Sequence, residues 1–229
     1  MIPKVIHYCW FGRGPKSKKT EHCIASWKQF CPDYQIIEWN EDNFDVNQNA
    51  YTRMCYQERK FAFLSDYVRL LVLEEFGGFY FDTDVEVVRR IDDLCGHDAF
   101  IGFETDYYVN TGQGFGCEAH NSAVKSMLNA YSELIDGSQE TQGCPILNTQ
   151  ALEGLGLVHN GKFQDLGSIV IFPKDYFNPY DDSTGRLHQT ENTYSIHWYA
   201  KSWMNRRTVI RSFLMKPIHR LIQTMGFKR

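Results

Sequence analysis

The segment from Lys60 to Val88 constrains the fold more than any other part of the chain. Its first half, Lys60–Phe76, is rich in helix formers, lacks glycine and proline, and is apolar enough to require a flank buried against a sheet. Gly77 and Gly78 can adopt the left-handed conformation that ends a helix. The aromatic residues that follow are typical of a buried strand. The segment therefore predicts a helix, a tight turn and a buried strand.

Two acidic residues follow that strand. Asp82 and Asp84 lie two residues apart directly after Phe81, where carboxylates without a partner are costly to bury. Hard divalent cations prefer oxygen ligands and also bind phosphate oxygens, so the pair is a candidate metal site. A turn formed by Asp-Thr-Asp without any metal would have the same sequence.

The preceding helix carries a polar pair of its own. Asp66 and Arg69 are three residues apart, so both lie on one face, within a stripe that is otherwise apolar. An ion pair internal to the helix would explain this pattern. Because the helix leads directly into the Asp82–Asp84 segment, we expect both polar pairs to meet in one cleft.

The start of the chain predicts an α/β fold. Lys4–Trp10 and Tyr34–Trp39 have the pattern of strands, and Ser17 can cap a helix that runs to about Phe30. A strand, helix and strand in succession indicate a parallel sheet. Later strands are expected at 99–104 and 169–172. The glycine-rich Thr111–Gly116 lacks the spacing of a dinucleotide site and is expected to be a loop.

Composition limits the kind of protein. A chain of 229 residues with 43% hydrophobic and 15% aromatic residues can bury one substantial core. It has no apolar run long enough to cross a membrane, and its first residues do not resemble a signal peptide. Seven scattered cysteines without a CxxC pair favour free thiols in a reducing compartment. We therefore expect a cytoplasmic protein.

The tail differs from the rest of the chain, so we expect domains at 1–203 and 204–229. From Met204 onward there are seven basic residues and no acidic one, whereas the remainder is acidic and does not favour nucleic-acid binding. Apolar residues recur in the tail at helical spacing, and Pro217 is expected to divide it into two short helices. The tail would either pack on the domain with a solvated basic face, or lie on an anionic membrane.

Two blocks resemble a known enzyme family. They are Ser-Asp-Tyr-Val-Arg-Leu, which begins at Ser65, and Gly-Gly-Phe-Tyr-Phe-Asp-Thr-Asp-Val-Glu-Val, which begins at Gly77. Together they resemble the DXD sugar-binding region of glycosyltransferase family 32, which includes yeast initiating mannosyltransferases, lactosylceramide galactosyltransferases and bacterial capsule enzymes. The catalytic domain of the large clostridial glucosylating toxins is more distantly similar.

The resemblance implies a GT-A-type fold, a Rossmann-like and mostly parallel sheet flanked by helices. It also implies a hexosyltransferase that uses Mn2+ or Mg2+ and retains the anomeric configuration. The donor would be a nucleotide-sugar, with UDP-hexose favoured over GDP-mannose. The acceptor would be a glycan or lipid-linked glycan in polysaccharide or capsule synthesis. A basic tail that lies on an anionic membrane would place this cytoplasmic enzyme on the inner face of that membrane.

The resemblance further assigns a metal site. Asp84 would be a metal ligand, and Asp82 would lie beside it, contacting the donor and reaching the metal directly or through water. The segment from Ser195 to Trp203 resembles the closing motif of the family, in which His197 would complete the metal shell.

The donor would be held by residues from three segments. Trp10 would stack on the nucleotide base, and Asp66 and Arg69, counted with the two DXD aspartates as catalytic, would hold sugar hydroxyls. The remaining donor-binding residues implied by the resemblance are Tyr80, Lys201, Ser202 and Trp203.

Two other functions remain open at this point. The strand that ends in Asp82 also fits a haloacid dehalogenase-like phosphatase, in which that aspartate attacks phosphate. That motif normally lies on the first strand, however, and here about 80 residues precede it. The other alternative is a non-catalytic subunit that binds a nucleotide-sugar.

Overall fold

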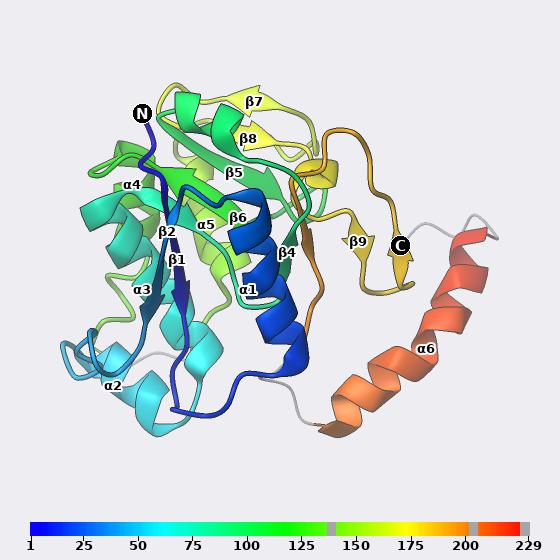
Figure 1. Ribbon diagram of the computed structural model, residues 1–229, viewed down its shortest axis with the longest axis horizontal. Coiled ribbons are helices and arrows are strands. Elements are labelled where there is room, and N and C mark those ends of the chain that lie inside the picture. The colour runs from blue at the N-terminus through cyan, green and yellow to red at the C-terminus, as the bar shows by residue number, and fades with distance from the viewer. Residues whose placement is uncertain (137–140, 202–205, 225–229) are drawn as a thin grey trace.

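The computed structural model describes residues 1–136, 141–201 and 206–224. A sheet of seven strands in the order β2-β1-β3-β6-β5-β8-β7 crosses the centre of the molecule (Figure 1). Five of its strands run in one direction, and β6 and β7 run against them. The strands are β1 (Val5–Cys9), β2 (Gln35–Trp39), β3 (Gly78–Tyr80), β5 (Ala99–Phe103), β6 (Val109–Cys117), β7 (Gln164–Asp165) and β8 (Val170–Phe172).

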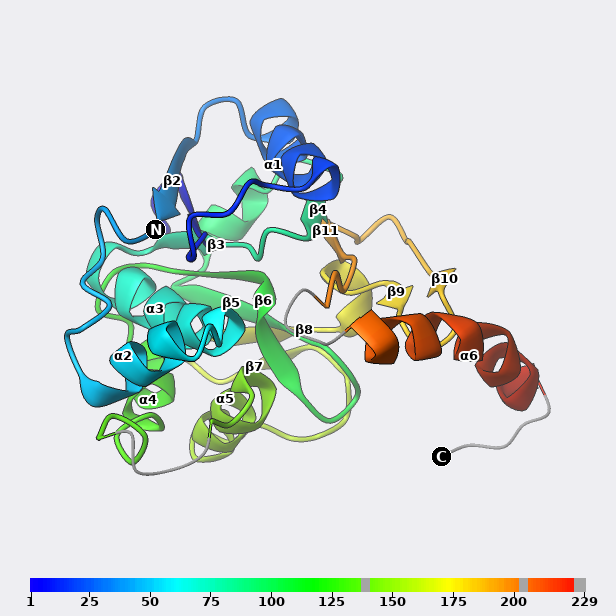
Figure 2. The same cartoon turned by 90° about the horizontal axis from the view of Figure 1, so that it is seen from below.

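Helices cover both faces of this sheet, as Figure 2 shows. The helix α1 lies on one face, and α2, α3, α4 and α5 lie on the other. Their bounds are α1 (Lys18–Phe30), α2 (Ala50–Gln57), α3 (Phe61–Phe76), α4 (Ser122–Asn129) and α5 (Cys144–Glu153). This three-layer arrangement confirms the expected α/β fold class.

Short elements complete the fold beside the sheet. Two antiparallel pairs form, β4 (Val85–Val87) with β11 (Ser195–His197), and β9 (Tyr180–Asp181) with β10 (Arg186–Leu187). Two 3-10 turns, η1 (Asp92–Gly96) and η2 (Lys174–Tyr176), connect strands. Among the described helices, none is long and apolar enough to cross a membrane.

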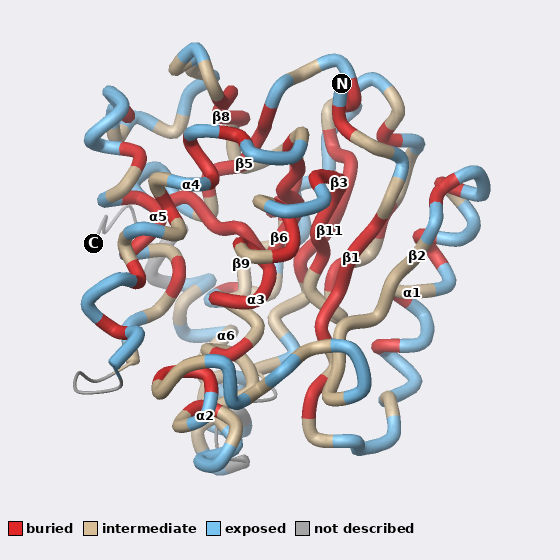
Figure 3. The backbone as a smooth tube through the Cα atoms, turned by 90° about the vertical axis from the view of Figure 1, so that its left-hand side faces the viewer, coloured by how far each residue is buried: buried red, intermediate tan, exposed pale blue. Residues whose placement is uncertain are grey.

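The strand–helix–strand start is confirmed. β1 and β2 pair in parallel, and the side chain of Ser17 accepts a hydrogen bond from the Thr20 N–H at 3.1 Å, which caps α1. Side chains of β1 alternate between the two faces, and Figure 3 shows the central strands buried. Ile6 points into the core under α1, and Cys9 points into the core under α3.

The expected helix, turn and strand at the centre of the chain are also confirmed. Gly77 ends α3 with a φ of 64° and donates its N–H to the carbonyl of Leu73 at 3.0 Å. The buried ring of His7 contacts the Gly77 carbonyl through Nε2 at 3.1 Å. This contact fixes the turn against β1, and burial lowers the pKa of His7 to about 4.

The prediction of a glycine-rich loop at Thr111–Gly116 is wrong. These residues lie within β6, which is buried along its whole length between β3 and β5. The glycines leave space for side chains that lie across the strand: a Cβ on Gly114 would meet the ring of Phe177 at 2.7 Å, and one on Gly116 would meet Phe100 at 2.5 Å.

The prediction that Pro217 divides the tail is also wrong. The helix α6 (Arg206–Thr224) runs continuously across it. Proline removes one backbone donor, and intact turns on both sides can keep the helix together despite that loss.

We expect Gly116→Ala to lower the free energy of unfolding by about 1–3 kcal/mol, because the new methyl group must displace the packed ring of Phe100. Urea denaturation followed by circular dichroism measures the change. Gly96→Ala is the matched control, since a Cβ there meets no atom within 4 Å. Equal stability of the two variants would show that β6 tolerates side chains on this face.

Candidate active site

The turn after β3 presents two carboxylates at one edge of the sheet. The Asp82 N–H donates to the Gly112 carbonyl at 2.8 Å, and the Val85 N–H donates back to the Asp82 carbonyl at 3.0 Å. β1 and β3 are parallel, so Trp10 and Asp82 follow strands that end at the same edge. Ligands of open α/β sheets bind at this carboxyl edge.

A buried ion-pair network fixes Asp82. The Nη2 atom of Arg69 lies 2.7 Å from Asp82 Oδ1 and 3.0 Å from Asp66 Oδ1. Arg69 also donates from Nη1 to the Thr111 hydroxyl at 3.2 Å, and its guanidinium lies 4.7 Å from the centre of the Tyr80 ring. The two polar pairs expected to meet do so, and Arg69 sets the position of the Asp82 carboxylate.

The carboxyl group of Asp66 has a raised pKa in this network. Burial raises the pKa of Asp66 to about 6, although attraction to Arg69 acts in the opposite direction. Arg69 is only 2% exposed, and the partners of its terminal nitrogens are protein groups. A direct contact of Asp66 or Arg69 with a sugar therefore stays a prediction, whereas the structure shows Arg69 bound to both Asp66 and Asp82.

His197 meets the second carboxylate through strand pairing. β11 pairs with β4, which places His197 opposite Val85 and brings its Nε2 atom to 3.4 Å from Asp84 Oδ1. The Ala200 N–H donates to Asp84 Oδ2 at 2.6 Å. The residues of the DXD turn and of the closing motif thus form one cluster.

The charges in this pair support each other. Burial opposes ionisation of Asp84, but attraction to His197 and the Ala200 hydrogen bond lower the pKa of Asp84 to about 2. Burial also disfavours the imidazolium, but the Asp84 carboxylate outweighs it and raises the pKa of His197.

These three residues fit a divalent cation. One ligand atom from each of Asp82, Asp84 and His197 lies within 4.8 Å of the others. Two carboxylates and an imidazole suit Mn2+ or Mg2+, and the buried Nδ1 atom of His197 has no hydrogen-bond partner within the described residues. Arg69 supports the carboxylate of Asp82 from outside this set, as groups around metal ligands commonly do.

The residues expected to bind the donor lie in different surroundings, some partly exposed and some buried. Trp10 is partly exposed at the end of β1, where its indole donates to the Gly14 carbonyl at 2.8 Å. Lys201 lies 2.5 Å from Asp182 Oδ2, and Tyr80 is buried beneath Arg69. Ser202 and Trp203 lie outside the described residues, so the donor roles of these residues stay predictions.

Two neighbours of the cluster were not predicted as parts of it. A Cβ on Gly112 would lie 2.0 Å from Asp82 Oδ2, so only glycine leaves room for that carboxylate. The Tyr199 ring lies 4.2 Å from the His197 ring, and its hydroxyl donates to Glu104 Oε1 at 3.0 Å. The glycine-rich pattern includes Gly112, but by itself it predicts a loop and not this close contact.

Comparison with known proteins identifies the central segment. Residues 17–101 match the family described as "Glycosyltransferase sugar-binding region containing DXD motif". Residues 17–101 are therefore similar to the DXD region of glycosyltransferases. This region contains Asp66, Arg69, Asp82 and Asp84, whereas His197 lies beyond it. The resemblance noted in the sequence is confirmed over this region.

Curated relatives agree over part of their length. The chain is 29% identical over 112 residues to mannosyl phosphorylinositol ceramide synthase SUR1 of Saccharomyces cerevisiae, and the match covers 44% of this chain and 27% of that protein. It is 27% identical over 111 residues to inositol phosphoceramide mannosyltransferase 3 of Schizosaccharomyces pombe, with 44% and 29% covered. The chain therefore matches less than a third of the length of these relatives.

Solved structures share the fold of the glycosyltransferase region. The PaToxG glycosyltransferase superposes with a TM-score of 0.51 at 23% identity, over 68% of this chain and 72% of that one. A glycosyltransferase involved in glycosylation of the major capsid of PBCV-1 superposes with a TM-score of 0.53 at 11% identity, over 93% and 99%. These likenesses support the GT-A fold expected from the sequence.

We expect Asp84→Ala to weaken Mn2+ binding by on the order of 100-fold, because one of two carboxylates is lost from a small ligand set. Isothermal titration calorimetry of the full chain measures this without any assay of activity. Asp33→Ala is the control, since Asp33 pairs with Lys4 just before β1, away from the carboxyl edge. Unchanged binding in Asp84→Ala would remove Asp84 from the metal site.

The raised pKa of Asp66 predicts a dependence of stability on pH. An unfolded aspartate titrates near about 3.9, so the fold holds the Asp66 proton up to about pH 6. The free energy of unfolding should therefore fall as pH rises from about 4 to 6, by at most about 3 kcal/mol from this group. Urea denaturation of wild type and Asp66→Asn across this range tests the sign. Parallel pH profiles of the two proteins would contradict it.

Proposed function

We propose that the chain transfers a hexose from a nucleotide-sugar to a glycan or lipid-linked glycan, with Mn2+ or Mg2+ as cofactor. The observation that carries the proposal is the Asp82–Asp84–His197 cluster at the carboxyl edge of a GT-A sheet, two of whose members lie in the matched DXD region. A bound divalent cation would neutralise the charge that develops on the departing diphosphate.

The residues of the chain have distinct roles in this proposal. Asp82, Asp84 and His197 would hold the cation, and Arg69 orients the carboxylate of Asp82 through their 2.7 Å ion pair. Trp10 offers an aromatic face to the nucleotide base, which is worth about 1–3 kcal/mol in comparable sites. Lys201 would donate to the diphosphate after leaving Asp182.

We propose that the reaction retains the anomeric configuration. The acceptor oxygen bonds to the anomeric carbon on the face from which the diphosphate oxygen departs, and the acceptor proton passes to the diphosphate. This route needs no nucleophile from the protein. It agrees with the engagement of Asp66 and Asp82 by Arg69, which leaves neither as a free nucleophile.

The donor and the setting are part of the proposal. The family resemblance favours UDP-hexose, and the two yeast relatives, both named for mannosyl transfer, make a mannosyl donor the second choice. A cytoplasmic location at the inner face of the membrane is supported by the cysteines, all seven of which are buried free thiols. Capsule or polysaccharide synthesis is the process we propose for it.

We expect at least one UDP- or GDP-sugar to release nucleoside diphosphate and free hexose slowly when incubated with the protein and Mn2+. Chromatography of the products with Mn2+, Mg2+ or EDTA measures this. EDTA should abolish the release, because without a cation nothing neutralises the charge that develops on the diphosphate. Asp84→Ala is the inactive control, and Asp33→Ala should retain the activity.

Other outcomes of the same assay identify the rival functions. Binding of a nucleotide-sugar without any hydrolysis or transfer would indicate a non-catalytic subunit. Release of phosphate from phosphate monoesters that depends on Asp82 would indicate a phosphatase. The ion pair of Asp82 with Arg69 opposes the second outcome, because it occupies an oxygen that would attack phosphate.

A further inference from the structure

The C-terminal helix α6 faces the domain with its polar side. Lys216 Nζ donates to the Tyr180 hydroxyl at 2.8 Å and lies 3.4 Å from Asp182 Oδ1. One turn later, Arg220 Nε donates to the Thr184 carbonyl at 2.5 Å. Figures 1 and 2 both show α6 beside β9. Two of the basic residues of the tail, Lys216 and Arg220, therefore join the helix to the domain.

A second polar link connects α6 to the segment that follows the metal cluster. Lys201 Nζ donates to Ser212 Oγ at 2.5 Å and lies 2.5 Å from Asp182 Oδ2. Lys201 is four residues after His197. The position of α6 is thus tied to the edge of the sheet that carries the candidate active site.

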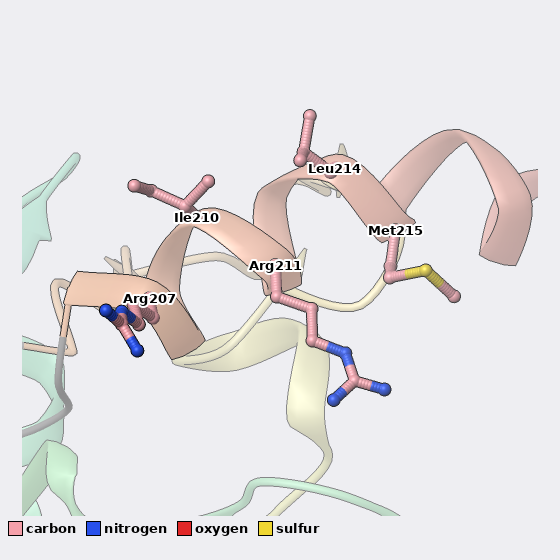
Figure 4. A pocket seen from close by; sticks show the side chains of 5 residues that line it. All are labelled: Arg207, Ile210, Arg211, Leu214 and Met215. Atoms are coloured by element: carbon pink, nitrogen blue, oxygen red, sulfur yellow. The ribbon is translucent and has the colours of Figure 1, made fainter.

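The apolar side of α6 points away from the domain. Surface helices usually turn their apolar stripe toward the core, but here the exposed fractions are 50% for Ile210, 70% for Phe213, 66% for Leu214 and 49% for Ile218. This spacing places the four side chains on one face. Figure 4 shows Ile210 and Leu214 projecting together from the outer side of the helix.

Positive charge flanks this apolar face. Arg207 and Arg211 are exposed and lie along its border, and the sequence of α6 contains no acidic residue. An exposed apolar stripe with cationic borders is the chemistry of helices that lie in the interface of an anionic bilayer.

We propose that α6 is an interfacial anchor that inserts Ile210, Phe213, Leu214 and Ile218 into the surface of an anionic lipid bilayer. Arg207 and Arg211 contact lipid phosphates, while Lys216 and Arg220 hold the domain on the opposite side of the helix. This function is independent of catalysis. It would also place the candidate active site near acceptors that are attached to lipid.

A second copy of the chain fits this face less well. Pairing two α6 helices through their apolar stripes would bring their arginines together, and the helix has no acid to pair with them. Anionic lipid headgroups complement both the apolar and the charged parts of the surface.

Sedimentation of the full chain with vesicles tests the proposal. We expect binding at low salt to vesicles of equal parts phosphatidylcholine and phosphatidylglycerol, and at least tenfold weaker binding to phosphatidylcholine alone. The variant F213E/L214E should bind the anionic vesicles at least about tenfold more weakly, since each replaced side chain loses its apolar burial. The variant R207Q/R211Q should lose about fivefold per arginine, mainly at low salt.

The matched control is L155E/V158E, which adds the same two charges outside α6. Leu155 and Val158 are also exposed apolar residues, with exposed fractions of 37% and 56%. It should bind like wild type. Thermal melting and Mn2+ binding confirm that each variant is folded, and Asp84→Ala should bind vesicles normally, which separates anchoring from the proposed catalysis.

Three outcomes would overturn the anchor. They are equal binding of F213E/L214E and wild type, equal loss in L155E/V158E, and absence of vesicle binding by wild type. If, in the last case, sedimentation equilibrium showed a wild-type dimer that F213E/L214E converts to a monomer, the face would be an interface between copies.

Discussion

The buried guanidinium of Arg69 is the charge on which the candidate site depends. A cation that is 2% exposed is tolerated only with close anionic partners, and Asp66 and Asp82 supply them at 3.0 and 2.7 Å. Because the first partner belongs to α3 and the second to the turn after β3, the network also joins the helix to the strand. Removal of either carboxylate would leave the buried Arg69 guanidinium with one anionic partner instead of two. The contact that fixes the DXD turn would then be lost or weakened. The same interaction therefore serves packing and chemistry.

The space for this network comes from glycine. Asp82 lies against β6 at Gly112, where any side chain would collide with its carboxylate. Further along β6, the ring of Phe177 covers Gly114 in the same way. A strand rich in glycine is weak by local propensity, and here the neighbouring strands and these covering groups hold it in place. The glycines that lower the strand propensity of β6 are therefore the same residues that let Asp82 lie close to its backbone.

Local signals explain which parts of the structure could be predicted from the sequence. The Ser17 cap, the Gly77 helix end and the DXD turn each depend on residues close together in the chain, and all three are found as expected. β6 could not be predicted, because its identity as a strand depends on partners such as Phe100 and Phe177 that are distant in sequence. The resemblance placed His197 in one metal shell with Asp84, and the pairing of β11 with β4 is what brings the two side chains together. The pattern also placed the Asp66–Arg69 pair in one cleft with Asp82 and Asp84, but only the structure shows that Asp66 and Asp82 share one nitrogen of Arg69.

The orientation of α6 shows how composition alone can mislead. Basic residues between apolar ones suggested a helix with a charged face toward solvent, yet Lys216 is held by Asp182 and Phe213 is 70% exposed. In water this arrangement leaves apolar area uncovered, which is unfavourable. The polar contacts with the domain do not remove that cost, because they involve the other side of the helix. A surface that covers the apolar stripe and also attracts Arg207 and Arg211 would remove it, and an anionic bilayer has both properties. Since Asp182 binds Lys201 as well as Lys216, burial of the stripe in lipid would fix the helix beside the segment that completes the metal cluster.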